Sequence, residues 1–240
     1  DFAVMLSSLS ALGYAVEWRV INAAEHGMPQ RRKRVFIFGE LGVPALKKNF
    51  DAREQLVENG LFAAAFPGAE AVSAVVRFEL DPDLARLTRT FNSWKERSPF
   101  QNAGFMHKGR VWTMRVKAAH VPGKVLGDVL LPTREVPREY FIAKSELPKW
   151  RRLKGAKKEL RTSASGHMYH YAEGAMTFPD AQDSPSRTIV TGEGGPGPSR
   201  FKHVVLTAEG KYRRLTPVEL ERLYMFPDQH TAGVPDGWRA

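Results

Sequence analysis

The sequence contains no cysteine among its 240 residues, and this absence narrows the possible chemistry. Disulfide bonds, zinc sites built on thiolates and cysteine nucleophiles are excluded within the chain. No stretch approaches the roughly 18 uninterrupted apolar residues of a membrane span, and the N-terminus lacks the basic, apolar and small-residue pattern of a secretory signal. We therefore expect a soluble, cytoplasmic protein with no membrane partner.

Acidic residues are scarce relative to basic ones. The sequence has 26 Asp and Glu against 36 Lys and Arg, which gives a net charge of +10 and an isoelectric point near 9.9. A surplus of this size favours a polyanionic partner, most often a nucleic acid. Hydrophobic residues make up 42% of the chain, which is enough for one large domain or two small domains with buried cores.

The first 44 residues have the pattern of a layered α/β domain. Apolar residues from Phe2 to Leu12 follow at helical spacing, and Val16, Trp18 and Val20 alternate with charged residues as in a half-buried strand. The apolar run 35–38 is typical of a strand buried on both faces of an α/β sheet. Because the chain starts with an aspartate inside this helical pattern, we expect a recombinant fragment, a proteolytic product or a part of a longer reading frame.

From about residue 45 the sequence becomes irregular, with short apolar runs broken by proline and glycine. Seven cations and one acid occupy residues 149–161, a pattern that fits either a solvated basic surface or a segment that follows phosphates. His167 and His170 have no carboxylates at metal-binding spacing, so we expect no metal site. Four aromatic residues are more typical of a core than of base stacking, namely Trp94, Phe100, Phe105 and Trp112.

Residues 192–198 contain too much glycine and proline for a regular element, which predicts a loop. Strand-like segments flank it at residues 187–191 and 203–206. A flexible linker is one reading of this loop. The other is a short turn that brings the backbone close to a ligand.

Residues 215–220 carry four signals for the start of a helix. Thr216 is an N-cap residue, Pro217 suits the first helical position, Glu219 completes a capping box, and Leu215 can pack on Leu220. A helix is therefore predicted to begin at about residue 216 and to end before Pro227.

The basic segment 30–34 leads directly into the apolar run of the second strand. If extended geometry begins at Gln30, then Gln30, Arg32 and Arg34 share one face of the strand. Guanidinium groups on that face suit an anionic or carbonyl-rich ligand. A charged strand edge that discourages aggregation is the alternative.

Two blocks of the sequence resemble those of DNA cytosine-5 methyltransferases. The first is Asn22 with residues 27–37, GMPQRRKRVFI, and the second is residues 213–223, RRLTPVELERL, followed by Phe226 and Pro227. They occur in the family's order and bracket most of the chain. The resemblance implies an α/β fold with a remnant of a Rossmann-like methyltransferase sheet at residues 1–44, and a mixed, irregular target-recognition domain at residues 45–240.

The resemblance also implies roles for single residues. Arg34 matches the arginine that lines the pocket of the flipped cytosine, Arg32 matches one that holds backbone phosphate, and Gln30 belongs to the same turn. Thr188 and Ile189 look like the recognition-loop signature, which places Gly192, Glu193, Gly194 and Gly195 near DNA, while Arg214 would support the domain.

Within residues 188–200, the side chains of Glu193 and Arg200 are the candidate base readers, for cytosine N4 and for guanine O6 and N7 respectively. Alternatively, both residues only order the loop, with Glu193 paired to Arg187. The two alternatives stay open at the level of sequence.

Three features of the family are absent from this sequence: the Pro-Cys loop with the nucleophile, the Glu-Asn-Val block and the glycine-rich donor turn. The chain also ends before the family's final helix. We therefore expect the N-terminal part of the enzyme to bind S-adenosylmethionine, and this chain to be inactive alone. The expected partners are double-stranded DNA and a possible separate N-terminal catalytic polypeptide. We expect a nucleoid-associated location in the cytoplasm of a prokaryote and a role in restriction-modification. The alternative is a non-enzymatic or split-enzyme DNA-binding subunit.

Overall fold

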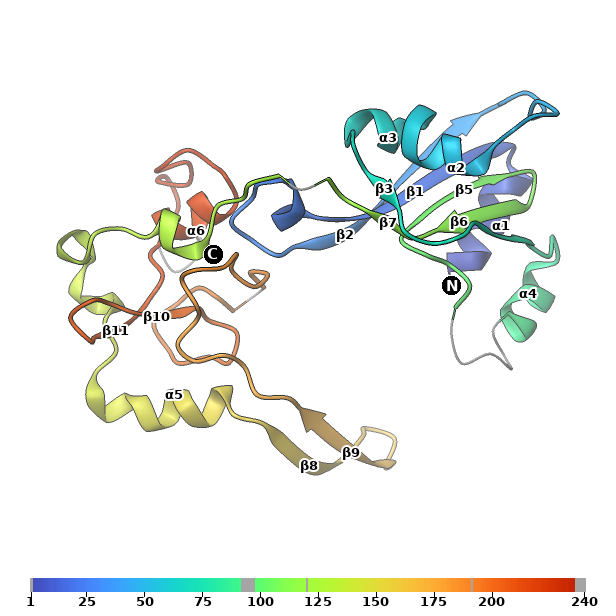
Figure 1. The fold of residues 1–240 in the computed structure, drawn as a ribbon. Coiled ribbons are helices and arrows are strands. Elements are labelled where there is room, and N and C mark those ends of the chain that lie inside the picture. Colours follow the sequence, from blue (N-terminus) through green and yellow to red (C-terminus); the bar gives the residue numbers. More distant parts are fainter. Residues whose placement is uncertain (1, 92–97, 120, 191, 236–240) are drawn as a thin grey trace. The chain divides into compact units, whose positions relative to one another are not determined.

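The computed structural model describes residues 2–91, 98–119, 121–190 and 192–235, and its ribbon is drawn in Figure 1. The chain forms two compact units. The first unit comprises Asp1–His26 and Lys33–Val121, and the second comprises Gly27–Arg32 and Pro122–Ala240. Both contain helices and strands, so the fold class is α/β as expected.

The first unit is built on an antiparallel sheet with the strand order β2-β1-β5-β6-β4. These strands span Tyr14–Asn22 (β1), Lys33–Leu41 (β2), Val76–Glu79 (β4), Ala103–His107 (β5) and Arg110–Met114 (β6). The predicted N-terminal helix is confirmed as α1, Phe2–Ala11, and the predicted first strand is confirmed as β1. Since β1 pairs with β2 on one side and β5 on the other, it is more buried than the half-buried strand that we expect from the sequence.

Alternation along β1 sends successive side chains to opposite faces of the sheet. Val16 and Trp18 join the apolar cluster that includes α1 and α4, Leu84–Thr90. Ala15 lies in the cluster on the other face, which includes Leu56. Gly104 on β5 is required here, because a Cβ atom at this position would lie 2.0 Å from Cζ2 of Trp18.

Shorter elements complete the first unit (Figure 1). They are η1, Ala23–His26; α2, Ala52–Glu54; η2, Gln55–Asn59; α3, Leu61–Ala65; and the paired strands β3, Glu70–Ala71, and β7, Val116–Lys117. The buried side chains of Glu17 and Arg19 fasten the η2–α3 segment to the sheet. Glu17 accepts hydrogen bonds from the backbone N–H groups of Leu61 and Phe62, and Arg19 donates to the Phe62 carbonyl at 3.1 Å.

The prediction that the second strand is buried on both faces is wrong for this chain. β2 is an edge strand, paired only with β1 among the described strands, and every residue in it is exposed. Val35, Phe36, Ile37 and Phe38 are 51%, 49%, 41% and 41% exposed. The run has the composition of a central strand, but no second neighbour covers it among the described residues.

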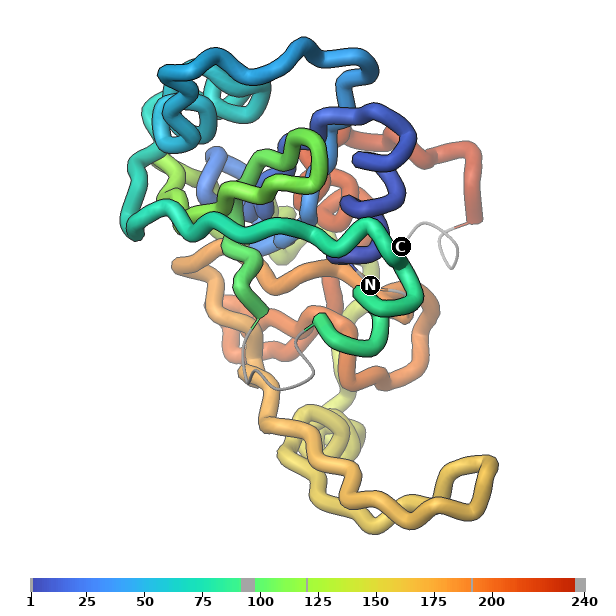
Figure 2. The backbone as a smooth tube through the Cα atoms, turned by 90° about the vertical axis from the view of Figure 1, so that its right-hand side faces the viewer, coloured from blue at the N-terminus to red at the C-terminus, as the bar shows by residue number. Residues whose placement is uncertain are grey.

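The second unit has little regular structure. Its elements are η3, Leu126–Val129; η4, Thr133–Glu135; η5, Arg138–Tyr140; η6, Lys144–Glu146; α5, Leu147–Lys154; β8, Lys157–Thr162; β9, Met168–Glu173; β10, Val204–Leu206; β11, Tyr212–Arg214; and α6, Pro217–Leu223. Its apolar cluster joins η3, β10 and α6. The β8–β9 hairpin extends away from the rest of this unit (Figures 1 and 2).

The predicted helix start at residues 215–220 is confirmed. Thr216 caps α6, Pro217 is its first residue, and the capping box with Glu219 forms. Leu215 and Leu220 lie in the same apolar cluster. The helix ends at Leu223, before Pro227.

The boundary between the two units lies at residues 121–122, and the short segment 27–32 belongs to the second unit although the residues on both sides of it belong to the first. The sequence instead suggests a boundary near residue 44. The reason is strand pairing, because β5 and β6 continue the sheet that β1 begins. Whether the catalytic and recognition functions divide near residue 44 stays a prediction. No helix among the described residues is long and apolar enough to cross a membrane.

Candidate nucleic-acid interface

The segment 27–32 is fastened to residues 186–188 by backbone hydrogen bonds. Ser186 N donates to the Pro29 carbonyl and Arg31 N donates to the Ser186 carbonyl, both at 2.7 Å. The Thr188 hydroxyl donates to the Arg31 carbonyl at 2.5 Å, across a separation of 157 residues. The structure thus brings the first basic block and the start of the candidate recognition loop together within the second unit.

Gln30 lies inside this junction. Its side chain is 1% exposed, and neither Oε1 nor Nε2 has a hydrogen-bond partner among the described residues. β2 begins at Lys33, and Gln30 forms only an isolated bridge with Ser186, so the shared face that we infer from alternation does not apply to it. This burial does not support the expected contact of Gln30 with DNA, which stays a prediction.

The arginines that follow Gln30 have different surroundings. Arg31 is exposed, and the half-buried Arg32 lies with its guanidinium carbon 5.7 Å from the centre of the Tyr224 ring, at the end of α6. A cation over an aromatic face is stabilised by the ring's electron density, so this contact links the first block to the second.

Arg34 belongs to β2 in the first unit, opposite Ile21. It is exposed, and its Nη1 donates to the carbonyl of Lys33 at 2.7 Å. It forms no ion pair with any residue that the structure describes. Its guanidinium therefore retains donors for a ligand.

The glycine-rich loop depends on its glycines for backbone conformation. Gly192 and Gly195 have φ values of +97° and +76°, in the region that side chains disfavour. A Cβ atom at Gly192 would meet no atom within 4 Å, so the conformation and not crowding requires glycine there. Gly194 is half-buried, and the Gly195 carbonyl accepts hydrogen bonds from Lys202 Nζ and from Arg214 Nη1.

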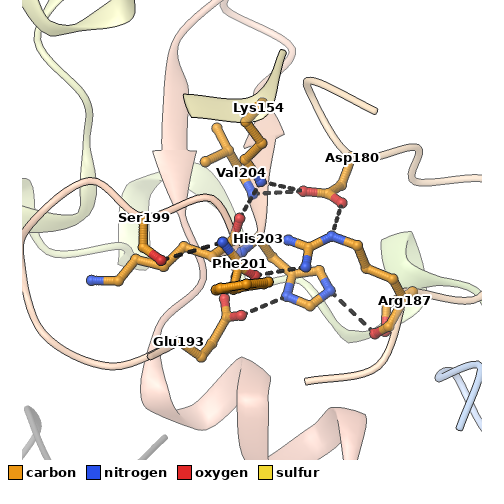
Figure 3. Close-up of polar contacts among 10 residues, drawn as sticks. Lys154, Asp180, Arg187, Glu193, Ser199, Phe201, His203 and Val204 are labelled. Atoms are coloured by element: carbon orange, nitrogen blue, oxygen red, sulfur yellow. Dashed lines mark hydrogen bonds and ion pairs between the residues drawn. The ribbon is translucent and has the colours of Figure 1, made fainter. Parts of the chain in front are cut away.

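The side chain of Glu193 is buried, which does not support its candidate role as a base reader. Its carboxylate accepts a hydrogen bond from the backbone N–H of His203 at 2.6 Å and lies 3.0 Å from His203 Nδ1 (Figure 3). The geometry favours the alternative in which Glu193 orders the loop. Its partner is His203, however, and not Arg187.

Arg200 is also committed inside the protein. Its Nη1 donates to the carbonyls of Leu153 and Gly155, both at 3.1 Å, and lies 3.0 Å from a carboxylate oxygen of Glu173. Its side chain is 12% exposed. The arrangement again favours loop ordering over base reading, because both Nη atoms already donate to acceptors within the protein.

Asp180 is the centre of a buried charged network that supports the loop (Figure 3). Its carboxylate accepts from Arg187 Nε and from the backbone N–H of Val204, both at 2.8 Å, and lies 3.8 Å from Lys154 Nζ. Arg187 also donates to the Phe201 carbonyl at 2.6 Å. Burial lowers the pKa of Lys154 from 10.5 to about 8, with a further contribution from the charge of Arg187.

The second of the two blocks, residues 213–223, forms the frame behind the loop. Arg213 makes a two-point ion pair with Glu219, at 2.7 and 2.9 Å, and the Glu219 carboxylate also accepts from Leu131 N. Arg214 lies over the Tyr140 ring, 5.0 Å from its centre, and burial lowers the pKa of this arginine. Arg214 thus has the supporting position that the resemblance implies.

Sequence reasoning missed Lys154, Asp180 and His203 as parts of this site. Lys154 was visible only as one of several cations in residues 149–161, and neither Asp180 nor His203 lies in a recognisable pattern.

The four aromatic residues that we expect in a core have different outcomes. Phe105 is buried, Phe100 packs on Trp18, Trp112 packs on Phe50, and Trp94 lies outside the described residues.

Comparison with known proteins places these features in a family. The family model for the C-5 cytosine-specific DNA methylases matches residues 1–237, so the chain belongs to this family. It is 38% identical over 240 residues to the Type II methyltransferase M.Sau3AI of Staphylococcus aureus. Shorter matches of 38 residues occur with M.NgoBV of Neisseria gonorrhoeae, at 55% identity, and with M.NlaIV of Neisseria lactamica, at 53%.

The match with M.Sau3AI covers 98% of this chain but 56% of the relative. The chain thus spans about half the length of that protein. The two shorter matches each cover 16% of this chain and 9% of the relative.

Proposed function

We propose that this chain is the DNA-recognition part of a site-specific cytosine-5 methyltransferase of a restriction-modification system. The complete enzyme would transfer a methyl group from S-adenosylmethionine to C5 of a cytosine extruded from duplex DNA. One observation carries the proposal: hydrogen bonds from Ser186 and Thr188 join the first basic block to the segment that leads into the glycine-rich loop. The family membership and the charge of +10 agree with DNA as the partner.

The reaction requires groups that this chain lacks. Cytosine C5 becomes nucleophilic when a thiolate adds to C6, and the base must first leave the stack. A chain without cysteine cannot supply that thiolate. Its own contribution is positioning, with the exposed guanidinium of Arg34 directed to the oxygen of the extruded base, where it stabilises charge without transferring a proton.

The residues of this chain do not fit the methyl donor. Sites for nucleotide-like cofactors commonly use a glycine-rich turn between a strand and a helix, because the helix N-terminus and close backbone approach hold the ligand. The glycine-rich segment here leads instead to β10, and the Gly195 carbonyl within it is occupied by Lys202 and Arg214. We therefore assign the donor site to the N-terminal part of the enzyme.

The bare edge of β2 supports a complementary catalytic part. An exposed, apolar edge strand presents unpaired N–H and C=O groups and tends to recruit another strand. The exposed residues Val35 to Phe38 would be covered by such a strand and by the elements that accompany it. The same edge favours a second candidate, a split enzyme in which a separate polypeptide supplies the catalytic part.

The experiment measures the binding of two ligands to the same chain. Titration of the chain with duplex DNA should give binding that weakens steeply with salt, whereas calorimetry with S-adenosylmethionine should give no measurable heat of binding. Methyl transfer should appear only when the N-terminal part of the S. aureus relative is added. Micromolar affinity of the chain alone for the donor would contradict the proposed division of labour.

Arg34 and Arg32 should respond differently when each is replaced by alanine in a complete enzyme. Arg34→Ala should lower turnover by about 10²-fold, with a smaller effect on DNA affinity, because a positioned charge at the flipped base is lost. Arg32→Ala should weaken binding to all sequences and lower the salt dependence by roughly one ion. Equal effects of both variants on turnover and salt dependence would show that these roles are assigned wrongly.

A further inference from the structure

The β8–β9 hairpin has two chemically different faces. Cross-strand partners in an antiparallel pair share a face, so the register divides the side chains into two sets. The first set, here called the paired face, is Lys157, Glu159, Arg161, Tyr169, Tyr171 and Glu173. The second, called the open face, is Lys158, Leu160, Thr162, Met168, His170 and Ala172.

The charges of the paired face are satisfied within the protein. Arg161 contacts Glu159 at 2.8 Å and lies over the Tyr171 ring, 3.6 Å from its centre. Lys157 lies 3.9 Å from Glu173, which also takes a hydrogen bond from the Tyr171 hydroxyl. Two cations and two carboxylates therefore balance on this face.

The open face has no such partners. All six of its residues are exposed, and Leu160 and Met168 are 57% and 58% exposed. It carries Lys158 and His170 but no acid, and Lys158 has no ion pair with any described residue. A face with an unpaired lysine and two exposed apolar side chains suits a polyanion that also offers apolar contacts.

The base of the hairpin extends the positive surface. A hollow of about 600 Å³ lies between α5 and β8, and its lining includes Lys149, Arg152 and Lys158. Lys157 and Glu159 also line it, but both are paired within the hairpin. Arg151 on α5, which is adjacent to Arg152 in the sequence, is also exposed. A cleft with this balance of charge concentrates anions.

The hairpin is also fixed to the glycine-rich loop. Arg200 follows that loop and contacts the carbonyls of Leu153 and Gly155, where α5 ends, and Glu173, where β9 ends. Because these contacts hold the base of the hairpin next to the segment that follows the loop, one ligand can reach both elements.

We propose that the open face of the β8–β9 hairpin lies in the major groove of duplex DNA, with the basic hollow at its base against the phosphates. A two-stranded ribbon fits the width of the major groove. Lys158 would contact phosphate, and Leu160 and Met168 would contact base edges, including thymine methyl groups. The inference rests on the proposed function, because it assumes that the chain binds duplex DNA.

A protein occupant fits this surface less well. A second copy of the chain would bring the same positive charge against the open face, at a net +10 for each chain. DNA instead complements the charge of Lys158 and of the hollow beneath it. Self-association through the hairpin is the competing outcome that the experiment below detects.

The test compares two single-charge changes on opposite faces of the same hairpin, Lys158→Gln and Arg161→Gln. Binding of the 240-residue chain to a duplex of about 30 base pairs is measured by fluorescence anisotropy over a range of salt. Lys158→Gln should lower the salt dependence by about one ion and weaken binding several-fold at low salt. Arg161→Gln, whose charge is paired internally, should keep the salt dependence of the parent chain.

A third variant, Leu160→Ser, separates apolar contact from charge. It should weaken binding by about threefold with the salt dependence unchanged, since no ion is released by an apolar contact. Circular dichroism and the melting temperature confirm that each variant folds. Equal responses of Lys158→Gln and Arg161→Gln, or dimerisation that Leu160→Ser abolishes, would overturn the inference while leaving DNA binding intact. A parent chain that does not bind the duplex would overturn the proposed function as well.

Discussion

In the first unit the buried side chains of the sheet are mostly apolar, whereas the second unit buries many charged groups. The buried charged residues of the first unit include Glu17, Arg19 and His107. Those of the second include Lys154, Asp180, Glu193, Lys202, His203, Arg213, Glu219 and Glu221. A sheet with two covered faces provides apolar burial directly, while a domain of loops needs specific polar contacts to fix its backbone.

The two units also differ in their exposed surfaces. In the first unit the exposed residues Val35 to Phe38 form a bare strand edge. In the second unit the glycine-rich loop has no regular element. Glu193 of this loop is held by the backbone N–H of His203, and the Gly195 carbonyl is held by the side chains of Lys202, which precedes β10, and of Arg214 on β11. A regular backbone therefore does not mean that a region has all of its packing partners.

Removing one partner of the buried Arg213–Glu219 pair should have the largest effect. Glu219→Ala leaves the Arg213 guanidinium and the N–H groups of Thr216 and Leu131 without their acceptor. We expect a loss of about 3–5 kcal/mol in the free energy of unfolding, measured by denaturant titration. The control is Glu135→Ala, which removes an exposed ion pair with Arg134 and should cost less than about 1 kcal/mol. Equal losses would mean that burial does not distinguish the two pairs.

A change in the apolar core of the first unit should have a smaller effect. Gly104→Ala places a methyl group where the Trp18 ring lies, so the ring must shift at a cost of about 1–3 kcal/mol. Gly174→Ala is the matched control, because a Cβ atom there meets nothing within 4 Å. Thermal unfolding measures both. A melting temperature unchanged by Gly104→Ala would show that the sheet tolerates repacking at this point.

The buried Lys154 predicts a dependence of stability on pH. Its folded pKa of about 8 lies below the ordinary value of 10.5, so between these values the unfolded chain binds more protons. Stability should therefore rise with pH in this window, by up to about 1.4 kcal/mol per pH unit from this group, and the contribution should be flat below pH 8. The measured quantity is the difference in unfolding free energy between the parent chain and Lys154→Met. A difference that falls with pH across this window would contradict the assigned cause.

The smallest predicted effect concerns the loop. Glu193→Gln keeps the shape of the side chain but removes the charge that faces His203. Because the side chain is buried, DNA affinity should fall by a few-fold and uniformly over a randomised duplex library, as expected when a hydrogen bond to a charged group is weakened. Arg200→Ala should act in the same uniform manner. A relaxed sequence preference of the variants at one or two base pairs would instead support base reading by both side chains.

Local sequence patterns predicted several elements correctly. The alternation of Val16, Trp18 and Val20 predicted β1, and the capping residues Thr216 and Glu219 predicted the start of α6. Both signals act over a few residues, so they are complete in the sequence. The apolar run 35–38 failed as a guide to burial, because burial depends on a neighbouring strand that the run does not encode.

The sequence by itself determined the basic charge, the absence of a thiolate nucleophile, the helix caps and the two blocks that carry the family resemblance. Only the tertiary structure decided which charged side chains are available to a ligand. Glu193 and Arg200 are held by His203 and by the base of the hairpin, while Arg34 and Lys158 remain exposed. The physical reason is that a side chain's availability depends on acceptors and donors brought from distant segments, and local spacing contains no record of those contacts.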